Sequence, residues 1–335
     1  MSDAGTHVHH VVVGDPTHGV ARLALQLSAG LPRTVVAALA GPDDARRAAA
    51  LLPGPEDAPA LHLHVNDDLL GPTPAATLGA LAAGRRVAVT LHDVPQPGEG
   101  DARVARRVAV YRELAAAADL VVVCSEHERA GMRRAGSDAD AVLPLPIDAR
   151  LVPAAPQADA TVGVLGWIHP GKGHAAVADA LATLDRPATL VALGGVARGH
   201  EGLDDELADR CARQGVGWRC TGYLHDMEQL RGASRVAVPV CPHRHVSASG
   251  SMGSWLSAGR RPLVVDGGYA REVAERNPGA IALVDDLAAA LGRALHDPAS
   301  TVLSPGTRVG PTTPGAAAAQ AALLHGWARP TGASA

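Results

Sequence analysis

Short apolar runs alternate with alanine-rich helical patterns along the whole chain of 335 residues. This alternation is typical of parallel β-sheets, because consecutive parallel strands are joined by helical crossovers that cover the faces of the sheet. In the first half we expect strands at 8–13, 34–39, 60–65, 86–91, 119–124 and 141–145. In the second half we expect strands at 162–165, 189–193, 217–220, 235–239, 262–265 and 279–284. The pattern predicts an α/β fold with one doubly wound sheet in each half.

The length of the chain fits two domains of about 150 residues each. A Pro/Ala-rich segment without apolar periodicity, 151–160, is expected to link a first domain (1–150) to a second domain (161–315). A last helix at about 316–328 follows a Pro/Gly/Thr-rich stretch and is expected to pack on the first domain. The two similar halves predict Rossmann-like domains that face each other across a cleft.

Composition excludes several classes of partner. The formal charge of -4 arises from interspersed acids and bases, so the sequence has no basic patch that would bind nucleic acid or a membrane surface. No apolar run has the length of a transmembrane segment, and the N-terminus lacks the pattern of a secretory signal. The four cysteines form no CxxC pair and are interpreted as reduced thiols. We therefore expect a cytoplasmic protein with small-molecule partners; the oligomeric state is not indicated.

A Gly/Pro-rich loop opens the second half. It follows the strand 162–165 and leads into a helix that begins near His174. The N-terminus of a helix presents unpaired N–H groups and the positive end of the helix dipole, so this arrangement suits an anion. Lys172, between Gly171 and Gly173, is the only lysine in the chain. The loop predicts a phosphate site, and an ordinary turn with a solvated lysine is the alternative.

Ligands of doubly wound sheets lie at the carboxyl ends of the strands. In the first half these ends carry a dense set of polar residues and a glycine: Asp15, His18, Gly19, Asn66, Asp67, Asp68, His92, Asp93, Ser125, Glu126 and His127. His92, at the end of the strand 86–91, is the leading candidate for contact with a reacting substrate. A buried histidine with a structural role is the alternative.

The same edge of the second sheet is expected to carry further ligands of an anion. The polar and glycine residues there are Lys172, Gly194, Gly195, His225, Asp226, Ser247, Ser249, Gly250 and Ser251. The loop 241–251 is rich in hydroxyl groups and precedes a helix, so it is a second candidate anion cradle.

Other histidines lie at or near the first and third expected strands. His7, His9 and His10 are near the N-terminus, and alternation places His62 and His64 on one face of their strand. This pair is compatible with a metal ion, but the sequence supplies no third ligand that can be placed. Zinc sites need three or four protein ligands, so we expect structural or solvated roles and no metal site.

Seven segments, taken in order, resemble the GT-B glycosyltransferases of the retaining, nucleotide-sugar-dependent family-4 type. They are HGVAR (18–22), VTLHD (89–93), ADLVVVCS (118–125), LPLPID (143–148), GWIHPGKG (166–173), TGYLHD (221–226) and AGRRPLVV (258–265). The resemblance covers nearly the whole chain. It implies a glycosyltransferase that moves a sugar from a nucleoside-diphosphate donor to a small-molecule or glycan acceptor with retention of configuration.

The resemblance also implies roles for particular residues. Lys172 binds the donor diphosphate, Gly19 lets the backbone approach both substrates, and His92 contacts the transferred sugar. The catalytic pair is thus His92 and Lys172. The expected donor site comprises Gly19, Gly166, Lys172, Gly173, His225, Arg244, Ser249, Gly250, Ser251 and Ser254. The expected acceptor site comprises His18, Asp67 and Asp93. No metal and no cofactor other than the nucleotide-sugar co-substrate are expected.

Two positions depart from the family pattern. Trp167 stands where the family has an arginine, which leaves Arg244 as one possible substitute. The two glutamates of the family fall near Val246 and Ser254, neither of which is acidic. Because the second glutamate usually holds the ribose, ribose contacts would pass to Ser254 or Ser251. The sugar, the base and the acceptor are not specified by the sequence.

These departures leave two other functions open. The first is a catalytically silent homologue that binds a nucleotide or a protein partner. The second is a sugar-nucleotide epimerase on the same scaffold, which would need carboxylates for proton transfer, and Asp67, Asp93 and Glu126 are available for that role.

Overall fold

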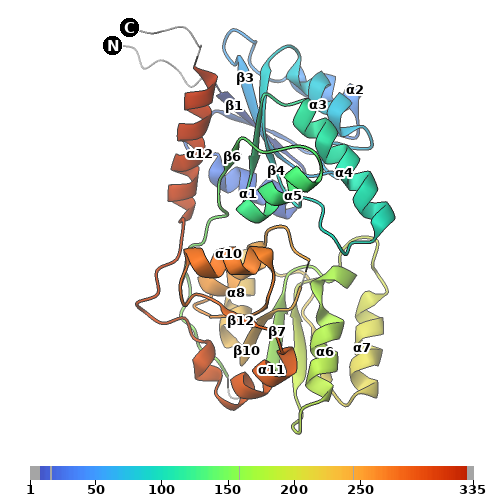
Figure 1. Cartoon of the computed structure of the whole chain (residues 1–335), viewed down its shortest axis with the longest axis vertical. Coiled ribbons are helices and arrows are strands. Elements are labelled where there is room, and N and C mark those ends of the chain that lie inside the picture. Colours follow the sequence, from blue (N-terminus) through green and yellow to red (C-terminus); the bar gives the residue numbers. More distant parts are fainter. Residues whose placement is uncertain (1–7, 16, 158, 244, 330–335) are drawn as a thin grey trace. The chain divides into compact units, whose positions relative to one another are not determined.

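The computed structural model describes residues 8–329 except 16, 158 and 244. Its internal contacts divide the chain into two compact units, 1–146 with 311–335, and 147–310. Each unit contains a six-stranded parallel sheet with helices on its faces (Figure 1). The prediction of an α/β fold with two doubly wound sheets is therefore confirmed. None of the described helices combines the length and the apolar character that a bilayer span requires.

The first sheet has the order β2-β1-β3-β4-β5-β6, and every pair is parallel. Its strands are β1 (Val8–Val13), β2 (Arg33–Val36), β3 (Ala60–Val65), β4 (Arg86–Leu91), β5 (Leu120–Val123) and β6 (Ala141–Val142). Its helices are α1 (Gly19–Leu27), α2 (Pro42–Ala49), α3 (Pro74–Ala82), α4 (Asp101–Ala116), α5 (Glu126–Arg134) and α12 (Thr313–Ala328). The chain order reverses between β1 and β3, so the loops after these strands lie at the switch point where such sheets bind ligands.

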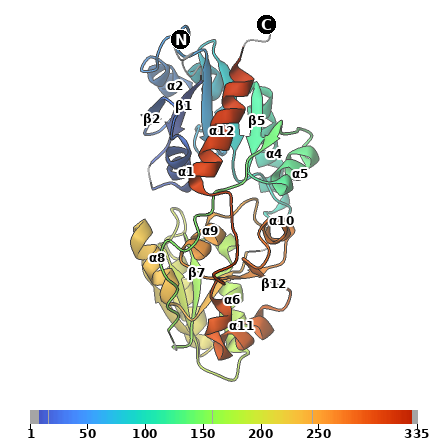
Figure 2. The same cartoon turned by 90° about the vertical axis from the view of Figure 1, so that its left-hand side faces the viewer.

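The two faces of the first sheet are covered by different helices. Side chains alternate along each strand, so one set of residues packs under α2 to α5 and the other under α1 and α12. On the second face Leu324 of α12 is fully buried against Val8 and Val122. The Gln320 side chain of α12 donates a hydrogen bond to the Leu27 carbonyl of α1, 3.1 Å away. Figure 2 shows α12 running across this sheet beside α1. The C-terminal helix is thus part of the first unit.

The second sheet has the order β12-β11-β10-β7-β8-β9, again parallel throughout. Its strands are β7 (Thr161–Leu165), β8 (Thr189–Leu193), β9 (Gly217–Cys220), β10 (Val238–Cys241), β11 (Leu263–Val265) and β12 (Ala282–Val284). Its helices are η1 (Pro170–Lys172), α6 (His174–Ala182), α7 (Leu203–Arg213), α8 (Asp226–Arg235), α9 (Gly250–Ser257), α10 (Gly268–Arg276), α11 (Leu287–His296) and η2 (Pro298–Thr301). Because β7 and β10 are neighbours, the loops that follow them lie side by side.

Two segments of the second unit differ from the expectation. The strand expected at 235–239 begins only at Val238, because α8 continues to Arg235. The strand also continues two residues beyond the expected end, to Cys241, and Pro239 lies inside it opposite Gly163. The segment 151–160, expected to link the two domains, has backbone hydrogen bonds to the second unit. Its Ala155 N–H, for example, donates to the Ser234 carbonyl at 3.0 Å.

A glycine inside β7 makes room for the largest buried side chain of the second unit. Trp255 of α9 is fully buried, and a Cβ added at Gly163 would lie 2.9 Å from its ring and 3.0 Å from Val236. Such distances cannot be tolerated without repacking. We expect Gly163→Ala to lower the free energy of unfolding by about 1–3 kcal/mol, measured as the urea dependence of tryptophan fluorescence.

Gly292→Ala is the matched control in the same unit. Gly292 lies within α11, and its added Cβ would meet Leu184 at an ordinary 3.6 Å. Alanine in a helix interior should raise stability by about 0.5–1 kcal/mol. Equal effects of the two substitutions would contradict the packing argument.

Candidate active site

The loop after β1 ends in a histidine that caps α1. The Val20 N–H donates to Nδ1 of His18 at 3.3 Å, so His18 satisfies one of the free N–H groups at the start of this helix. Gly19 is the first residue of α1, and a Cβ added there would meet no other atom within 4 Å. The fold itself does not require glycine at this position. The backbone at Gly19 is open to the approach of another molecule.

His92 lies at the end of β4, as expected, but its side chain is only 6% exposed. Its Nε2 is 2.8 Å from Nδ1 of His64, and its Nδ1 is 3.5 Å from the Cys124 sulfur. Burial, followed by the charge that His64 and His18 would carry, lowers the pKa of His92 well below its usual value. The imidazole is therefore neutral at pH 7, and both of its nitrogens have partners inside the first unit.

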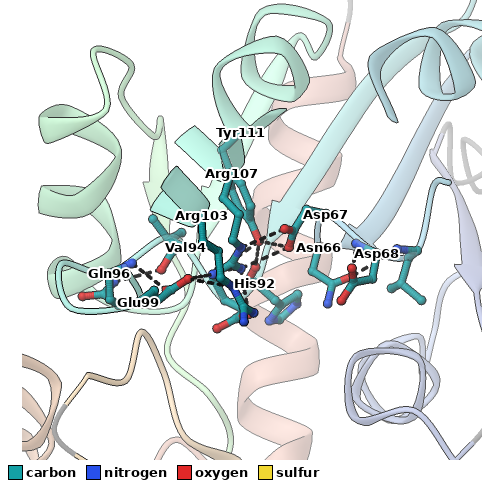
Figure 3. A network of polar contacts seen from close by, with 12 residues as sticks. Asn66, Asp67, Asp68, His92, Val94, Gln96, Glu99, Arg103, Arg107 and Tyr111 are labelled. Atoms are coloured by element: carbon teal, nitrogen blue, oxygen red, sulfur yellow. Dashed lines mark hydrogen bonds and ion pairs between the residues drawn. The ribbon is translucent and has the colours of Figure 1, made fainter. Parts of the chain in front are cut away.

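An arginine of α4 organises the loops after β3 and β4 (Figure 3). Arg107 is 3% exposed and forms ion pairs with three carboxylates. Its Nε and Nη2 bind Asp67 at 2.7 and 3.0 Å, and Nη1 binds Glu99 at 2.6 Å. Nη2 also donates to the carboxylate and to the carbonyl of Asp93, at 2.8 and 2.6 Å. Arg107 therefore brings together Asp67 and Asp93, the two carboxylates predicted for the acceptor site.

The two carboxylates differ in exposure. The Asp67 side chain is 17% exposed and that of Asp93 is 60% exposed, so Asp93 is the one more available to a ligand. Asp93 also has a positive φ of 56°, which is uncommon outside glycine. Loss of water raises the pKa of its carboxyl to about 6; Arg107 opposes this shift, whereas the charges of Glu99 and Asp67 add to it.

Sequence reasoning missed the residues that hold this network. Arg107 is one of several arginines on a long helix, and no local pattern distinguishes it. Tyr111, one turn later on α4, is fully buried and its hydroxyl donates to the carbonyls of His92 and Asp93. The spacing of Arg107 and Tyr111 on one helix face was the available signal. Their partners became apparent only from the strand order.

In the second unit the ammonium of Lys172 points toward the start of α9. Its Nζ donates to the Ser251 hydroxyl at 3.1 Å, and Ser251 in turn lies 3.0 Å from the Ser249 hydroxyl. Burial lowers the pKa of Lys172, and the nearby Cys241 thiol opposes the shift. Among the described residues no carboxylate forms an ion pair with this ammonium. The structure thus brings Lys172 and the predicted anion cradle 249–251 together.

The glycines beside Lys172 have specific steric roles. A Cβ at Gly166, where φ is 109°, would lie 3.2 Å from Nζ of Lys172. A Cβ at Gly173, where φ is 89°, would lie 3.0 Å from Pro242 in the loop after β10. Both positions therefore favour glycine, which allows the lysine loop and the serine loop to approach each other.

The first turn of α9 is polar. Ser249 is its N-cap residue without a side-chain cap bond, and Gly250 is its first residue. The Ser254 hydroxyl donates to the Gly250 carbonyl at 3.2 Å. Because the first N–H groups of a helix have no partner within the helix, this turn can donate to an anion beside Lys172.

Two aromatic rings stack at the same edge of the second sheet. Trp167 and Tyr223 are each 43% exposed, and their ring centroids are 5.6 Å apart at an interplanar angle of 27°. His225, the N-cap of α8, packs edge-on against Tyr223 with centroids 5.4 Å apart. The position at which the resemblance leads us to expect an arginine is therefore part of an exposed aromatic surface.

Two further histidines lie near Lys172: His174, at the start of the helix after the phosphate loop, and His243, within the predicted cradle loop 241–251. His174 and His243 are buried, and neither ring has a hydrogen-bond partner among the described residues. Burial first, and the charge of Lys172 second, lower the pKa of both, that of His174 to about 3. Both rings are neutral at pH 7. The predicted donor ligand Arg244 lies outside the described residues.

Part of the chain matches a family of known proteins. Residues 1–148 match the family model described as a glycosyl transferase 4-like domain. A search of curated protein sequences finds no match.

Solved structures resemble the chain over nearly its whole length. HepE from Anabaena, in complex with UDP-glucose, has a TM-score of 0.69 and 15% identity, with 96% of this chain and 97% of that chain covered. Sucrose-phosphate synthase from Thermosynechococcus elongatus has a TM-score of 0.68 and 16% identity, with 96% and 95% covered. A glycosyltransferase from Rickettsia africae has a TM-score of 0.65 and 11% identity, with 95% and 97% covered. The chain therefore has the GT-B glycosyltransferase fold, as predicted.

The charge balance around Arg107 gives a prediction about stability. Replacing Arg107 by Met would leave Asp67, Glu99 and Asp93 to repel one another. We expect the free energy of unfolding to fall by up to about 3 kcal/mol at pH 8. This is the low end of the effect of breaking a buried ion pair, because the carboxylates are partly exposed. At pH 5 Asp93, with its pKa near 6, is mostly protonated, so the loss should be smaller.

Urea unfolding of the wild type and of Arg107→Met at pH 8 and pH 5 measures the loss of stability at each pH. Arg103→Met is the control, because Arg103 contacts Glu99 at 3.5 Å from an exposed position and should change stability by less than about 1 kcal/mol. A loss for Arg107→Met that is independent of pH would contradict the electrostatic explanation.

Proposed function

We propose that this protein transfers a sugar from a nucleoside-diphosphate donor to a hydroxyl-bearing acceptor, with retention of anomeric configuration. The observation that carries the proposal is the ammonium of Lys172 at the first turn of α9, hydrogen-bonded to Ser251. The match of residues 1–148 to the glycosyl transferase 4-like domain and the likeness to HepE with bound UDP-glucose support it.

In this proposal the second unit binds the donor. A diphosphate oxygen takes the place of the Ser251 hydroxyl as the acceptor for Lys172 Nζ, and the first N–H groups of α9 donate to the same phosphates. When the bond between the sugar and the diphosphate breaks, negative charge develops on the leaving phosphate. Fixed donors aimed at this charge lower the barrier more than they stabilise the bound donor, which is electrostatic catalysis.

Other residues of the second unit contact the rest of the donor in this proposal. Gly166, Gly173, Ser249 and Gly250 shape the phosphate loop, and Ser251 or Ser254 binds the ribose in place of the family's glutamate. The Trp167–Tyr223 pair, with His225 at its edge, offers a flat surface on which the nucleobase can stack. We assign the nucleobase of the donor to this aromatic surface.

The first unit binds the acceptor. Arg107 compensates only part of the charge of Asp67, Glu99 and Asp93, so the edge around them stays negative. Carboxylates are acceptor-only groups and suit hydroxyl donors of a sugar or a polyol. Asp93 and His18 are the proposed acceptor contacts, Gly19 gives both substrates access to the backbone, and His92 contacts the transferred sugar.

The proposal includes a cytoplasmic location and a transfer step that uses no metal at the diphosphate. All four cysteines are free thiols, which suits a reducing compartment. Lys172 and the N-terminus of α9 supply the positive potential that a bound cation provides in other transferases. Turnover that is unchanged in EDTA would agree with this step, and turnover restored only by added Mg²⁺ would contradict it.

The direct test is the release of nucleoside diphosphate from a panel of UDP-, GDP-, ADP- and TDP-sugars. We expect Lys172→Ala to lower turnover by at least about 100-fold, because it removes a donor aimed at the developing charge. The change should leave the circular dichroism spectrum unaltered. Coupled detection of the released diphosphate measures the rate.

Arg213→Ala is the control for net charge, since Arg213 is an exposed residue of α7 in the same unit. It should retain wild-type turnover. If no donor of the panel is turned over or raises the melting temperature of the wild type, the proposal is wrong.

Replacement of Trp167 tests the aromatic surface. Trp167→Ala should weaken binding of the free nucleoside diphosphate by about 10- to 100-fold, the usual effect of losing one base–aromatic stack. Trp167→Phe keeps a ring and should bind more tightly than the alanine variant. Isothermal titration with UDP and with inorganic pyrophosphate separates the contributions, because pyrophosphate has no base and its affinity should not change.

A catalytically silent homologue is the second candidate, favoured by Ser254 at the position of a family glutamate. It predicts that a nucleotide-sugar binds in titration but that neither hydrolysis nor transfer occurs with any acceptor offered. Turnover by the wild type that depends on Lys172 would exclude it.

A further inference from the structure

Three imidazoles lie together inside the first unit. His10 comes from β1, and His62 and His64 come from β3, the neighbouring strand. His10 and His62 are register partners, and all three project from the sheet face that α1 and α12 cover. Their ligand nitrogens lie within 4.8 Å of one another, and the residues are at most 2% exposed.

Such a cluster is unusual for a core position. Histidines are seldom fully buried, and the neighbouring residues on this face are Val8, Val12 and Ala60. Burial first lowers the pKa of each ring, that of His64 to about 4. All three rings are neutral at pH 7 and keep an unprotonated nitrogen, which is the form that binds a metal.

Two of the three histidines have hydrogen-bond partners of the kind that support metal-bound histidine. Nε2 of His62 lies 2.9 Å from the Thr90 hydroxyl. Nε2 of His64 lies 2.8 Å from the Gln320 side-chain oxygen, and its Nδ1 lies 2.8 Å from Nε2 of His92, so an ion on His64 would take the place of one of these two contacts. Nε2 of His10 has no hydrogen-bond partner among the described residues.

The nitrogens turned toward each other have the spacing of a ligand set. Nδ1 of His10 and Nδ1 of His62 are 2.9 Å apart. Two nitrogens bound to one tetrahedral zinc ion at about 2.05 Å are about 3.3 Å apart, so a small adjustment admits an ion. Without an ion, one of the two Nδ1 atoms must carry a proton, and the same ring then presents an unprotonated Nε2 to the core.

We propose that His10, His62 and His64 bind one first-row transition-metal ion, Zn²⁺ in the first instance, as a structural site beneath the candidate active site. Three imidazoles without a carboxylate select Zn²⁺ and its neighbours over Mg²⁺ or Ca²⁺, which prefer oxygen ligands. A cavity of about 10 Å³ lies beside His64, Thr90, Cys124 and Gln320, but His10 and His62 do not line it.

The ion would tie β1 to β3 and fix which nitrogen of His64 carries the proton. His64 contacts His92, so the site would also orient the imidazole at the end of β4. The proposal does not depend on the transferase assignment, since it rests on residues of the sheet interior and its test measures metal content.

The experiment is expression of the full chain in medium supplemented with ZnCl₂ or CoCl₂, followed by gel filtration in EDTA to remove surface-bound ions. We expect about one zinc ion per chain by mass spectrometry. The cobalt form should show the intense visible absorption of tetrahedral Co²⁺. Zinc should also raise the melting temperature of chelator-treated protein.

His9→Gln is the matched control, because His9 lies on the same strand but on the opposite face, with Nε2 2.8 Å from the Thr34 hydroxyl. It should keep the full metal content. His10→Asn, His62→Asn and His64→Asn should each lower it to less than about a tenth, in line with a loss of more than 10-fold in affinity. His10→Asn removes one side-chain hydrogen bond, that with His62, and is the variant most suited to fold.

Two results would overturn the proposal. One is folded wild-type protein that contains neither zinc nor cobalt and whose melting temperature does not respond to either ion. The other is a loss of metal in His9→Gln equal to that in the three cluster variants, which would place the ion on surface histidines. If no cluster variant folds, the cobalt spectrum of the wild type and of His9→Gln decides between four-coordinate imidazole ligation and its absence.

Discussion

The proposed binding of the donor depends on one ammonium group that has no counter-ion among the described residues. Nζ of Lys172 is held between the loop after β7 and the first turn of α9, with a serine hydroxyl as its hydrogen-bond acceptor. A partly buried cation of this kind is costly unless a charge is supplied from elsewhere. The glycines on both sides of the loop, and the helix that starts beside it, are arranged around this group. An incoming diphosphate would complete the pairing.

Parallel strand order explains why the remaining candidates gather where they do. Crossover connections place the carboxyl ends of all six strands of a sheet at one edge, and the reversal of order between β1 and β3 opens a binding position there. In the first unit this edge carries an excess of carboxylates that Arg107 holds in place. In the second unit it carries Lys172 and free helix N–H groups. The two edges have opposite character, as the binding of a hydroxyl donor and of an anion requires.

Much of this could be predicted from the sequence, because strands such as 86–91 and 162–165 are short, largely apolar runs that end in polar loops. His92 and Lys172 lie after the ends of these two strands. Arg107 could not be predicted, since its three partners come from loops that only the tertiary fold brings together. The position of His10 beside His62 and His64 could not be predicted either, because it depends on the register of β1 on β3, which the local sequence does not specify.

A crystal structure of the full chain with UDP tests the central claim most directly. The account predicts diphosphate oxygens within hydrogen-bonding distance of Lys172 Nζ and of the first N–H groups of α9, with the Ser251 contact of the ammonium replaced or shared. A nucleotide bound elsewhere, with Lys172 still paired to Ser251 alone, would contradict it.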